Sequence, residues 1–319
     1  MPALSTFIIE CMPKSRLLPI LEAIFAVVIW GGTFIATKIA LQEVSPATIV
    51  WLRFGMGVLI LGATVLIRRQ FSLPVKNEWG YFALLGFLGV TFHQWLQANG
   101  LVTAQATTTA WIVASTPIFI AILGAIVLKE KLGFLRSAGV GLAGCGVILV
   151  VSKGDIPGLF SGLAGTLGDV LVFISAINWA IFSILSRREL DKHPAARMMF
   201  YVMLWGWLFS GVWIFGFGPG LTEVIKLTSS GWAAILMLGV FGSGLAYIAW
   251  YDALQALPAS QLGVFLNIEP LVTAVLAALM LAEKITVVSI SGGMIILAGV
   301  YLVNKTPLSS KSGTDVPDP

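Results

Sequence analysis

The chain has 319 residues, of which 58% are hydrophobic and only 11% are charged, and its mean hydropathy is +0.95. Soluble domains are about 45–50% apolar and about 25% charged, so a soluble, disordered or collagen-like chain is excluded. The net charge of +4 comes from basic residues scattered between apolar segments, which argues against a nucleic-acid surface. The two cysteines, Cys11 and Cys145, are far apart, so no disulfide framework is expected. The composition predicts an all-α polytopic membrane protein.

Ten stretches are long and apolar enough to cross a bilayer, since a spanning helix needs about 20 mostly apolar residues. In chain order they are 18–39, 47–67, 79–99, 104–127, 134–151, 162–185, 198–218, 231–253, 259–281 and 287–304. They divide the chain into a tail at 1–17, five spans within 18–152, five spans within 162–304, and a tail at 305–319. The remaining loops are short, so we expect no soluble catalytic or nucleotide-binding domain.

Basic residues predict the orientation, because short loops rich in Lys and Arg stay in the cytoplasm. With the N-terminus inside, fourteen of the 19 Lys and Arg residues fall on the inner side. Arg53 lies within a span, and four residues fall on the outer side: Lys38, Lys153, Lys226 and Lys284. Both termini are therefore expected in the cytoplasm.

The two blocks of five spans are related by an internal repeat. A shift of 153 residues superimposes 86–150 on 239–303 without a gap, and the superimposed pairs include Gly86 and Gly239, Gly89 and Gly242, Pro117 and Pro270, and Glu130 and Glu283. An odd number of spans per repeat makes the second copy enter the membrane from the opposite side. Inverted repeats of this kind are typical of secondary transporters. The alternative is a duplication kept only for packing.

Three sequence motifs carry a resemblance to a known family. They are Trp30-Gly31-Gly32-Thr33-Phe34, Pro117 followed by Leu128-Lys129-Glu130-Lys131-Leu132, and Pro270 followed by Leu281-Ala282-Glu283-Lys284-Ile285. Over about 18–304 the chain resembles the EamA-type, ten-helix members of the drug/metabolite transporter superfamily. The resemblance implies two tandem inverted repeats and export of small metabolites through a bacterial inner membrane. The second copy of the first motif reads Asn178-Trp179-Ala180, so the two halves need not line a cavity equally.

Other motifs favour packing over chemistry. The run 139–144 matches the spacing of a dinucleotide-binding motif, but it lies inside a span, where small residues allow close helix contact. We expect Gly139, Gly144, Gly292 and Gly299 to serve such contacts. The chain has no nucleotide-binding P-loop, and its two histidines, His93 and His193, are far apart in sequence. No cofactor and no metal site are therefore expected.

Charged residues inside spans are informative, because such a group at the bilayer centre costs about 2.5–3.5 kcal/mol on insertion scales. Glu269 directly precedes Pro270, whose missing N–H should free the carbonyl of Leu266 at the same depth. We expect Glu269 either to bind a proton or a substrate ammonium group, or to form a structural hydrogen bond. Arg53 is expected either to snorkel to the outer surface or to bind an anionic group. The other charges are expected at membrane interfaces or in structural pairs: Glu22, Lys38, Asp169 and Asp252.

The third span carries a cluster of polar residues that predicts part of a substrate cavity. His93, Gln94, Gln97 and Asn99 fall within two helical turns, and the 153-residue shift pairs them with Ala246, Tyr247, Trp250 and Asp252. The predicted substrate-binding residues are Glu269, Gln94, Gln97, His93, Trp30, Trp111, Asn178, Trp179, Tyr247, Trp250 and Asn267. The expected hinges are Pro117, Pro270, Gly31 and Gly32.

The sequence therefore predicts a secondary transporter that exports a small amino-acid-like or drug-like metabolite by alternating access. A channel or receptor is the alternative, and an enzyme is disfavoured because no clustered acid, base and ligand set is present. The expected partners are a small-molecule substrate, the lipid bilayer, and protons or an exchanged solute, with no nucleic acid. Monomer and homodimer both stay open.

Overall fold

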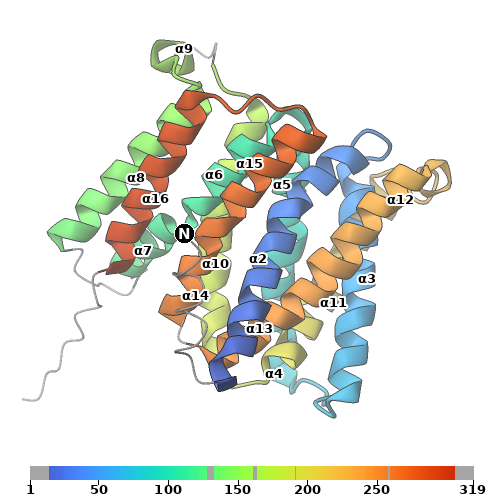
Figure 1. Ribbon diagram of the computed structural model, residues 1–319. Helices are drawn as coiled ribbons and strands as arrows, with labels where there is room; N and C mark the ends of the chain where they lie inside the picture. The colour runs from blue at the N-terminus through green and yellow to red at the C-terminus, as the bar shows by residue number, and fades with distance from the viewer. Residues whose placement is uncertain (1–13, 128–132, 161–163, 191, 258, 306–319) are drawn as a thin grey trace, which may run out of the picture.

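The computed structural model describes residues 14–127, 133–160, 164–190, 192–257 and 259–305, and the regular structure of these residues is helical throughout (Figure 1). The motif at 128–132 lies outside the described residues. In chain order the elements are α2 (Lys14–Ala40), α3 (Pro46–Ile67), α4 (Lys76–Gly86), η1 (Phe87–Phe92), α5 (His93–Thr103), α6 (Ala106–Ala114), α7 (Thr116–Val127), α8 (Phe134–Ser152), α9 (Ile156–Phe160), α10 (Leu167–Leu190), α11 (Ala195–Gly216), η2 (Val224–Lys226), α12 (Ser229–Leu236), η3 (Met237–Leu245), α13 (Ala246–Ala256), α14 (Ala259–Phe265), η4 (Leu266–Ile268), α15 (Glu269–Met280) and α16 (Val287–Lys305).

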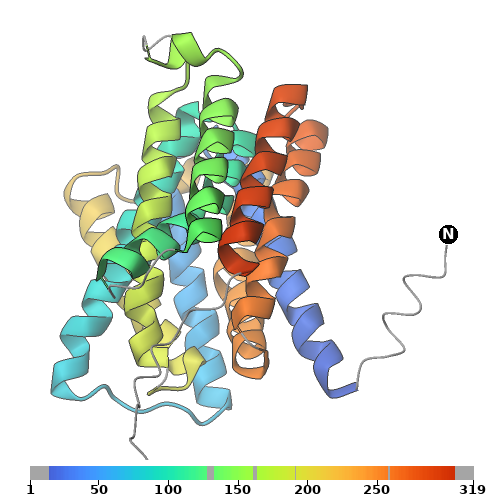
Figure 2. The ribbon, with the colours of Figure 1, turned by 90° about the vertical axis from the view of Figure 1, so that its left-hand side faces the viewer.

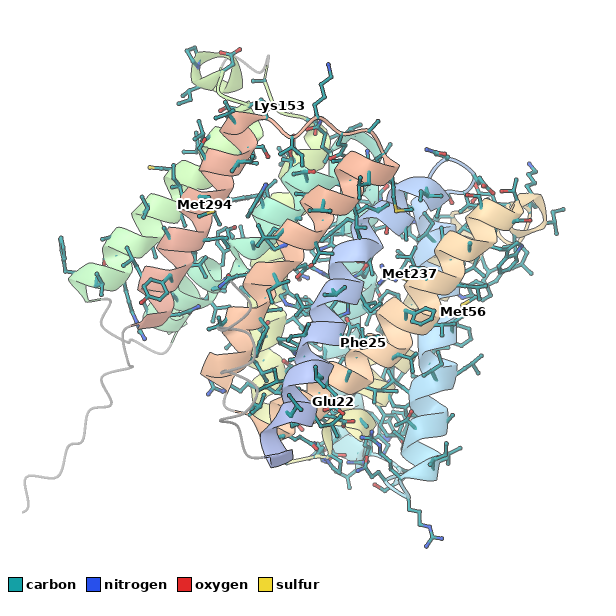
Figure 3. All side chains as sticks on the ribbon, in the orientation of Figure 1. Glu22, Phe25, Met56, Lys153, Met237 and Met294 are labelled. Carbon is teal, nitrogen blue, oxygen red and sulfur yellow. The ribbon has the colours of Figure 1, made fainter. Side chains whose placement is uncertain are left out.

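The long helices run roughly antiparallel between two ends of a bundle. We call the end at which α2 begins the lower end, and the end at which α2 finishes the upper end, as drawn in Figure 1. Glu22 lies near the lower end of α2, and Lys153 lies at the upper end of α8 (Figure 3). Helices α2, α3, α11 and the run α12–η3–α13 pack together on one side, whereas α8 and α16 stand side by side at the opposite edge (Figures 1 and 2).

Nine helical segments of the described chain are long and apolar enough to cross a membrane. They cover nine of the ten predicted spans, and the tenth, 79–99, lies within the helical run α4–η1–α5, whose polar residues lower its hydropathy. Large apolar side chains point outward from these helices, for example Leu59 at 74% exposed and Leu279 at 77%. In water such a surface would aggregate, whereas lipid solvates it. The protein is therefore a multi-pass, all-α membrane protein.

Each predicted span corresponds to one helical run, numbered here in the order of the ten spans. Two of these runs, the fourth (α6–α7) and the ninth (α14–η4–α15), are interrupted by a proline at mid-length. In the fourth run Pro117 has no N–H for the carbonyl of Val113, and the hydroxyl of Thr116 donates to that carbonyl instead at 2.6 Å. In the ninth run the helix tightens into the 3₁₀ turn η4 before Pro270. The carbonyl of Leu266 accepts the backbone N–H of Glu269 there, so the expectation that this carbonyl is free is wrong.

Two other runs contain a π-helical segment, η1 in the third run and η3 in the eighth. Most of η3 coincides with η1 after the 153-residue shift, and the break at Ser115 coincides with Ile268. Segments of π-helix are rare and are frequent at functional sites. The matching interruptions agree with a repeat, although the inverted relation of the two halves stays a prediction.

Helices α8 and α16 approach each other closely through glycine. A Cβ added at Gly139 would lie 2.7 Å from the carbonyl oxygen of Gly299, and one at Gly146 would lie 2.7 Å from that of Gly292. Only residues without a side chain allow this backbone separation, so the predicted packing role of Gly139, Gly292 and Gly299 is confirmed. The same prediction is wrong for Gly144, because a Cβ there would meet no atom within 4 Å.

Candidate functional site

Each π segment receives a hydrogen bond from a side chain on a distant helix. The indole Nε1 of Trp30, on α2, donates to the carbonyl oxygen of Gly242, on η3, at 3.1 Å. The amide Nδ2 of Asn178, on α10, donates to the carbonyl oxygen of Leu88, on η1, at 2.7 Å. A π turn displaces backbone carbonyls from regular helical bonding, and a side-chain donor can then satisfy them. Both contacts tie one half of the chain to the other.

A group of polar side chains surrounds the first of these contacts, and we call it the central cluster: Trp30, Arg53, Gln94, Ser243 and Tyr247. Arg53 Nε donates to Ser243 Oγ at 3.0 Å, and Arg53 Nη1 donates to Gln94 Oε1 at 3.0 Å. The side chain of Arg53 is only 6% exposed. The cluster draws on α2, α3, α5, η3 and α13, and it includes residues of both halves.

The guanidinium of Arg53 points into the bundle and does not snorkel. Arg53 lies two turns from the upper end of α3, but its partner Ser243 lies halfway along the run from Ser229 to Ala256. The side chain therefore extends toward the middle of the bundle. Of the two expectations for this residue, surface snorkelling is excluded by this geometry.

Aromatic rings form one wall of the central cluster. The ring of Trp30 lies 5.6 Å from that of Tyr247 in an edge-on arrangement and 5.3 Å from that of Trp250, between ring centroids. Tyr247 is followed one turn later by Tyr251, whose ring is stacked at 6.3 Å. The structure therefore brings together four predicted site residues: Trp30, Gln94, Tyr247 and Trp250.

A second group of predicted residues lies across α5 from the central cluster. The ring of His93 is 5% exposed, its Nδ1 lies 3.1 Å from the carbonyl oxygen of Ser175, and it is 4.7 Å from the ring of Trp179. The ring of Trp179 in turn packs against that of Phe182, with 4.8 Å between the ring centroids. Because His93 and Gln94 are adjacent in sequence, the two groups adjoin through α5, but the His93 group is closely packed and already bonded.

Glu269 begins α15 beside α2. A Cβ added at Gly31 would lie 2.9 Å from the carbonyl oxygen of Glu269, and the hydroxyl of Thr273 lies 2.9 Å from the carbonyl oxygen of Gly31. The side chain of Glu269 is half-buried, and its carboxylate forms no hydrogen bond or ion pair with a residue in the described ranges. Gln97 and Asn267 are also half-buried. The carboxylate is thus placed within the bundle without serving a structural bond to the described chain.

Several predicted residues lie apart from the central cluster or have a packing role. Trp111 is 3% exposed, and its ring fills the space beside Gly293, where an added Cβ would lie 2.5 Å from it. Gly31 and Gly32 lie inside the uninterrupted helix α2, where they admit α15 and the side chain of Met237. Pro117 and Pro270 lie at the two breaks described above. Their role as hinges stays a prediction.

The two ends of the bundle are held by different contacts. At the upper end a pocket of about 430 Å³ is lined by polar residues that include Lys38, Gln105 and Glu283. Lys38 Nζ donates to the carbonyl oxygen of Leu101 at 2.9 Å, and Glu283 Oε1 accepts the backbone N–H of Ala106 at 2.8 Å. At the lower end Arg68 and Asp252 form a bidentate ion pair at 2.6 Å, which raises the pKa of Arg68.

The remaining charged residues hold local structure. Asp169, expected in a structural pair, accepts both the backbone N–H and the hydroxyl of Thr166 at the start of α10. No group of three His, Cys, Asp or Glu side chains that could hold a metal ion occurs within the described ranges.

The site residues predicted from sequence omit two members of the central cluster, Arg53 and Ser243, although binding of an anionic group was one of the two expectations for Arg53. An isolated arginine inside an apolar span was the available signal for the first. Ser243 gave none, because a serine between two glycines in a span is more often a packing residue.

Comparison with known proteins identifies the family. The sequence profile of the EamA-like transporter family matches residues 17–152 and 166–305. An "Uncharacterized transporter" of Archaeoglobus fulgidus is 31% identical over 274 residues, which are 86% of this chain and 93% of that protein. The "Uncharacterized transporter YyaM" of Bacillus subtilis is 26% identical over 272 residues, 85% of this chain and 88% of that protein.

A solved crystal structure has the same fold. It superimposes with a TM-score of 0.64 and covers 90% of this chain and 98% of its own, at 19% sequence identity. Three findings agree on the family: the two profile matches, which together span nearly the whole chain, the relative above 30% identity, and the apolar helical bundle. The chain belongs to the EamA-like transporter family and is a multi-pass membrane transporter.

Proposed function

We propose that the protein is a secondary transporter that carries a small metabolite by alternating access, with the central cluster as its solute site. The observation that carries this proposal is the set of polar side chains from five elements that gather around Gly242 and the Arg53–Ser243 hydrogen bond, halfway along the eighth run. Polar groups inside a membrane are costly, and they usually mark a substrate or ion pathway. Their placement between the two halves of the chain is where transporters with inverted repeats bind solute.

The interrupted helices support a rearrangement around that site. The π segments η1 and η3 and the proline breaks at Pro117 and Pro270 lie in the middle of their runs. Breaks at this depth let the upper and lower parts of a helix tilt separately. The Arg68–Asp252 ion pair at the lower end and the Lys38 contact at the upper end are the bonds that such tilting would open in turn.

Glu269 is assigned the coupling role in this proposal. Its carboxylate has no bonding partner in the described part of the chain, so it is free to exchange a proton or to bind the ammonium group of a solute. Asn267 and Gln97, both half-buried, are the candidates to line the path between Glu269 and the central cluster.

The test is counterflow in proteoliposomes. Purified protein is reconstituted, vesicles are loaded with one unlabelled compound from a panel of carboxylates, amino acids, nucleosides and organic cations, and entry of the same labelled compound is measured. A carrier gives saturable, transient accumulation driven by the unlabelled solute. Flux that is linear in concentration and insensitive to the loaded compound would indicate a channel and would overturn the proposal.

The proposed direction is export, and the proposed location is the cell membrane with both termini in the cytoplasm. The lower end is then cytoplasmic, and the upper end faces outward. After replacement of Cys11 and Cys145 by Ser, a single cysteine at Thr222, near the upper end, should react with a membrane-impermeant maleimide in intact cells. One at Lys192, near the lower end, should react only after the membrane is permeabilised. The reverse pattern would invert the orientation.

A further inference from the structure

Arg53 is a cation inside the bundle, and its hydrogen-bond partners among the described residues are uncharged. Its two hydrogen bonds go to neutral acceptors, Ser243 Oγ and Gln94 Oε1. No carboxylate of the described chain forms an ion pair with it, in contrast to Arg68, which is paired with Asp252. A buried charge of this kind is ordinarily compensated, because an uncompensated one is strongly destabilising.

Nη2 of Arg53 lies beside the backbone of Gly242 and forms no hydrogen bond to a described residue. A Cβ added at Gly242 would lie 3.6 Å from Nη2 and 2.8 Å from Cγ2 of Thr33, so glycine lets the π segment approach both side chains closely. Trp30 is bonded to the Gly242 carbonyl and packs on Tyr247, so aromatic rings adjoin this contact.

A planar guanidinium with a free edge is suited to a carboxylate. Arginine presents its donors in a fork that matches two carboxylate oxygens, and hydrogen bonds between charged groups are roughly twice as strong as neutral ones. The aromatic rings beside it would accommodate an apolar body attached to that carboxylate.

From this geometry we infer that Arg53 binds a carboxylate group of the transported solute in the central cluster, beside Gly242, Trp30 and Tyr247. The inference rests on the proposed function and narrows it, because it requires the solute to carry an anionic group. Glu269, on the α15 flank of α2, then meets a different part of the solute or a proton.

The test uses benzoate and its neutral isostere benzamide, because the two differ in charge and hardly in shape. Binding is measured as the concentration-dependent rise in melting temperature of the full-length protein in detergent. Benzoate should stabilise the protein saturably, and benzamide should not. Absence of a benzoate effect, or equal effects of the two compounds, overturns the inference.

Three variants locate the effect. Arg53→Gln should weaken the apparent affinity for benzoate by about tenfold or more, which is the range expected for a lost charge-assisted pair. Arg187→Gln removes an exposed cation near the lower end, at the end of α10, and should leave the benzoate response unchanged. Gln94→Glu places a carboxylate against Arg53 and preserves the size of the side chain, so it should fold and should abolish the response. A full benzoate response in Gln94→Glu contradicts the inference even if Arg53→Gln fails to fold.

Counterflow separates this inference from the proposed function. Saturable counterflow of carboxylates that is lost in Gln94→Glu supports both. Saturable counterflow confined to neutral or cationic compounds supports the proposed transport function and overturns the role of Arg53 in binding a carboxylate.

Discussion

The two π segments receive the same kind of contact in different surroundings. At η3 the donor is Trp30, and the neighbouring residue Ser243 binds the guanidinium of Arg53. At η1 the donor is Asn178, and the ring of Trp179 beside it packs in a tilted arrangement on the imidazole of His93. Near η3 the guanidinium of Arg53 keeps its Nη2 without a hydrogen bond to a described residue. Near η1 the aromatic rings of His93, Trp179 and Phe182 pack against one another.

This difference shows that a repeated backbone feature need not have repeated surroundings. The π turn supplies a displaced carbonyl in both halves, and a polar side chain from the other half satisfies it in both. Among the described residues around the two segments, the η3 side alone adds a charge without an ion-pair partner, that of Arg53. We therefore assign solute binding mainly to the η3 side, and we assign to the η1 side the task of holding α5 and α10 together. The predictions that follow test this asymmetry.

The largest effect is expected at Glu269, whose counterpart after the 153-residue shift is Thr116. Glu269→Gln keeps size and hydrogen-bonding capacity but removes the ionisable group, so it should reach the membrane and lose most net transport of the best-transported panel compound. Thr116→Val removes only the hydrogen bond to the Val113 carbonyl and should lower stability by about 1 kcal/mol while retaining transport. Uptake into proteoliposomes, normalised to folded protein, measures both. Normal uptake by Glu269→Gln at every pH would show that the carboxylate has no role in coupling.

A second pair compares two glycines that the shift superimposes. A Cβ at Gly86 would lie 2.5 Å from the carbonyl oxygen of Val202 and 2.8 Å from the backbone nitrogen of Gly206. A Cβ at Gly239 would lie 2.5 Å from the sulfur and 2.9 Å from the Cβ of Met56, so it meets a side chain whose end can move and no backbone atom among its nearest neighbours. Gly86→Ala should therefore destabilise the protein by about 1–3 kcal/mol, as overpacking does, and Gly239→Ala by a smaller amount.

Melting temperatures of the two purified variants, compared with wild type, measure that difference. Met56 lies at the contact between α3 and the eighth run, where this adjustment would take place, whereas Met237 packs beside Gly32 of α2 (Figure 3). Equal losses in the two variants would mean that η1 and η3 are packed equally tightly.

A third pair removes the two donors to the π segments. Asn178→Leu and Trp30→Phe each leave one carbonyl without its side-chain partner, so each should cost about 1–3 kcal/mol of stability. Trp30→Phe keeps an aromatic ring beside Tyr247 and Trp250, but it changes the lining of the space around Arg53. We therefore expect a raised KM for transport in Trp30→Phe that exceeds any change in Asn178→Leu. A larger change in Asn178→Leu would move the solute site to the η1 side.

Hydropathy was sufficient to predict most of the fold. Apolar stretches of about 20 residues must become helices in a bilayer, because their backbone groups have no other partners there. The two proline residues Pro117 and Pro270 were expected as hinges, and both lie at helix breaks, because proline lacks the N–H that continues a helix. The prediction of close packing failed for Gly144, because the face that a helix turns toward its neighbour depends on packing and not on composition.

The site was only partly predictable for a related reason. Trp30, Gln94, Tyr247 and Trp250 were identified because polar or aromatic residues inside spans are unusual. The partners of Arg53 were not, because they depend on the direction of one long side chain and on the turn of η3 that presents Ser243. The ring of Trp111, a predicted cavity residue, packs beside Gly293 on α16, and its role in solute binding stays a prediction.

The smallest effect is expected at the loops that close the upper end. Glu223 accepts the hydroxyl of Thr48 at 2.6 Å and the backbone N–H of Ser45 at 2.8 Å, at the start of α3. Burial acts to raise the pKa of Glu223, but these hydrogen bonds together outweigh it, so the pKa lies below its usual value. A carboxyl group whose pKa is lowered by folding stabilises the protein fully above its unfolded pKa of about 4.3, and that contribution is lost as the pH falls through the folded pKa.

At the lower end the corresponding loops are held by Arg197 and His193 against Glu78. Glu223→Gln should therefore lower the melting temperature slightly at neutral pH and flatten its decline between about pH 5 and pH 3, which thermal unfolding in a pH series measures. Parallel declines in wild type and Glu223→Gln would show that the loss at acid pH arises at the lower end.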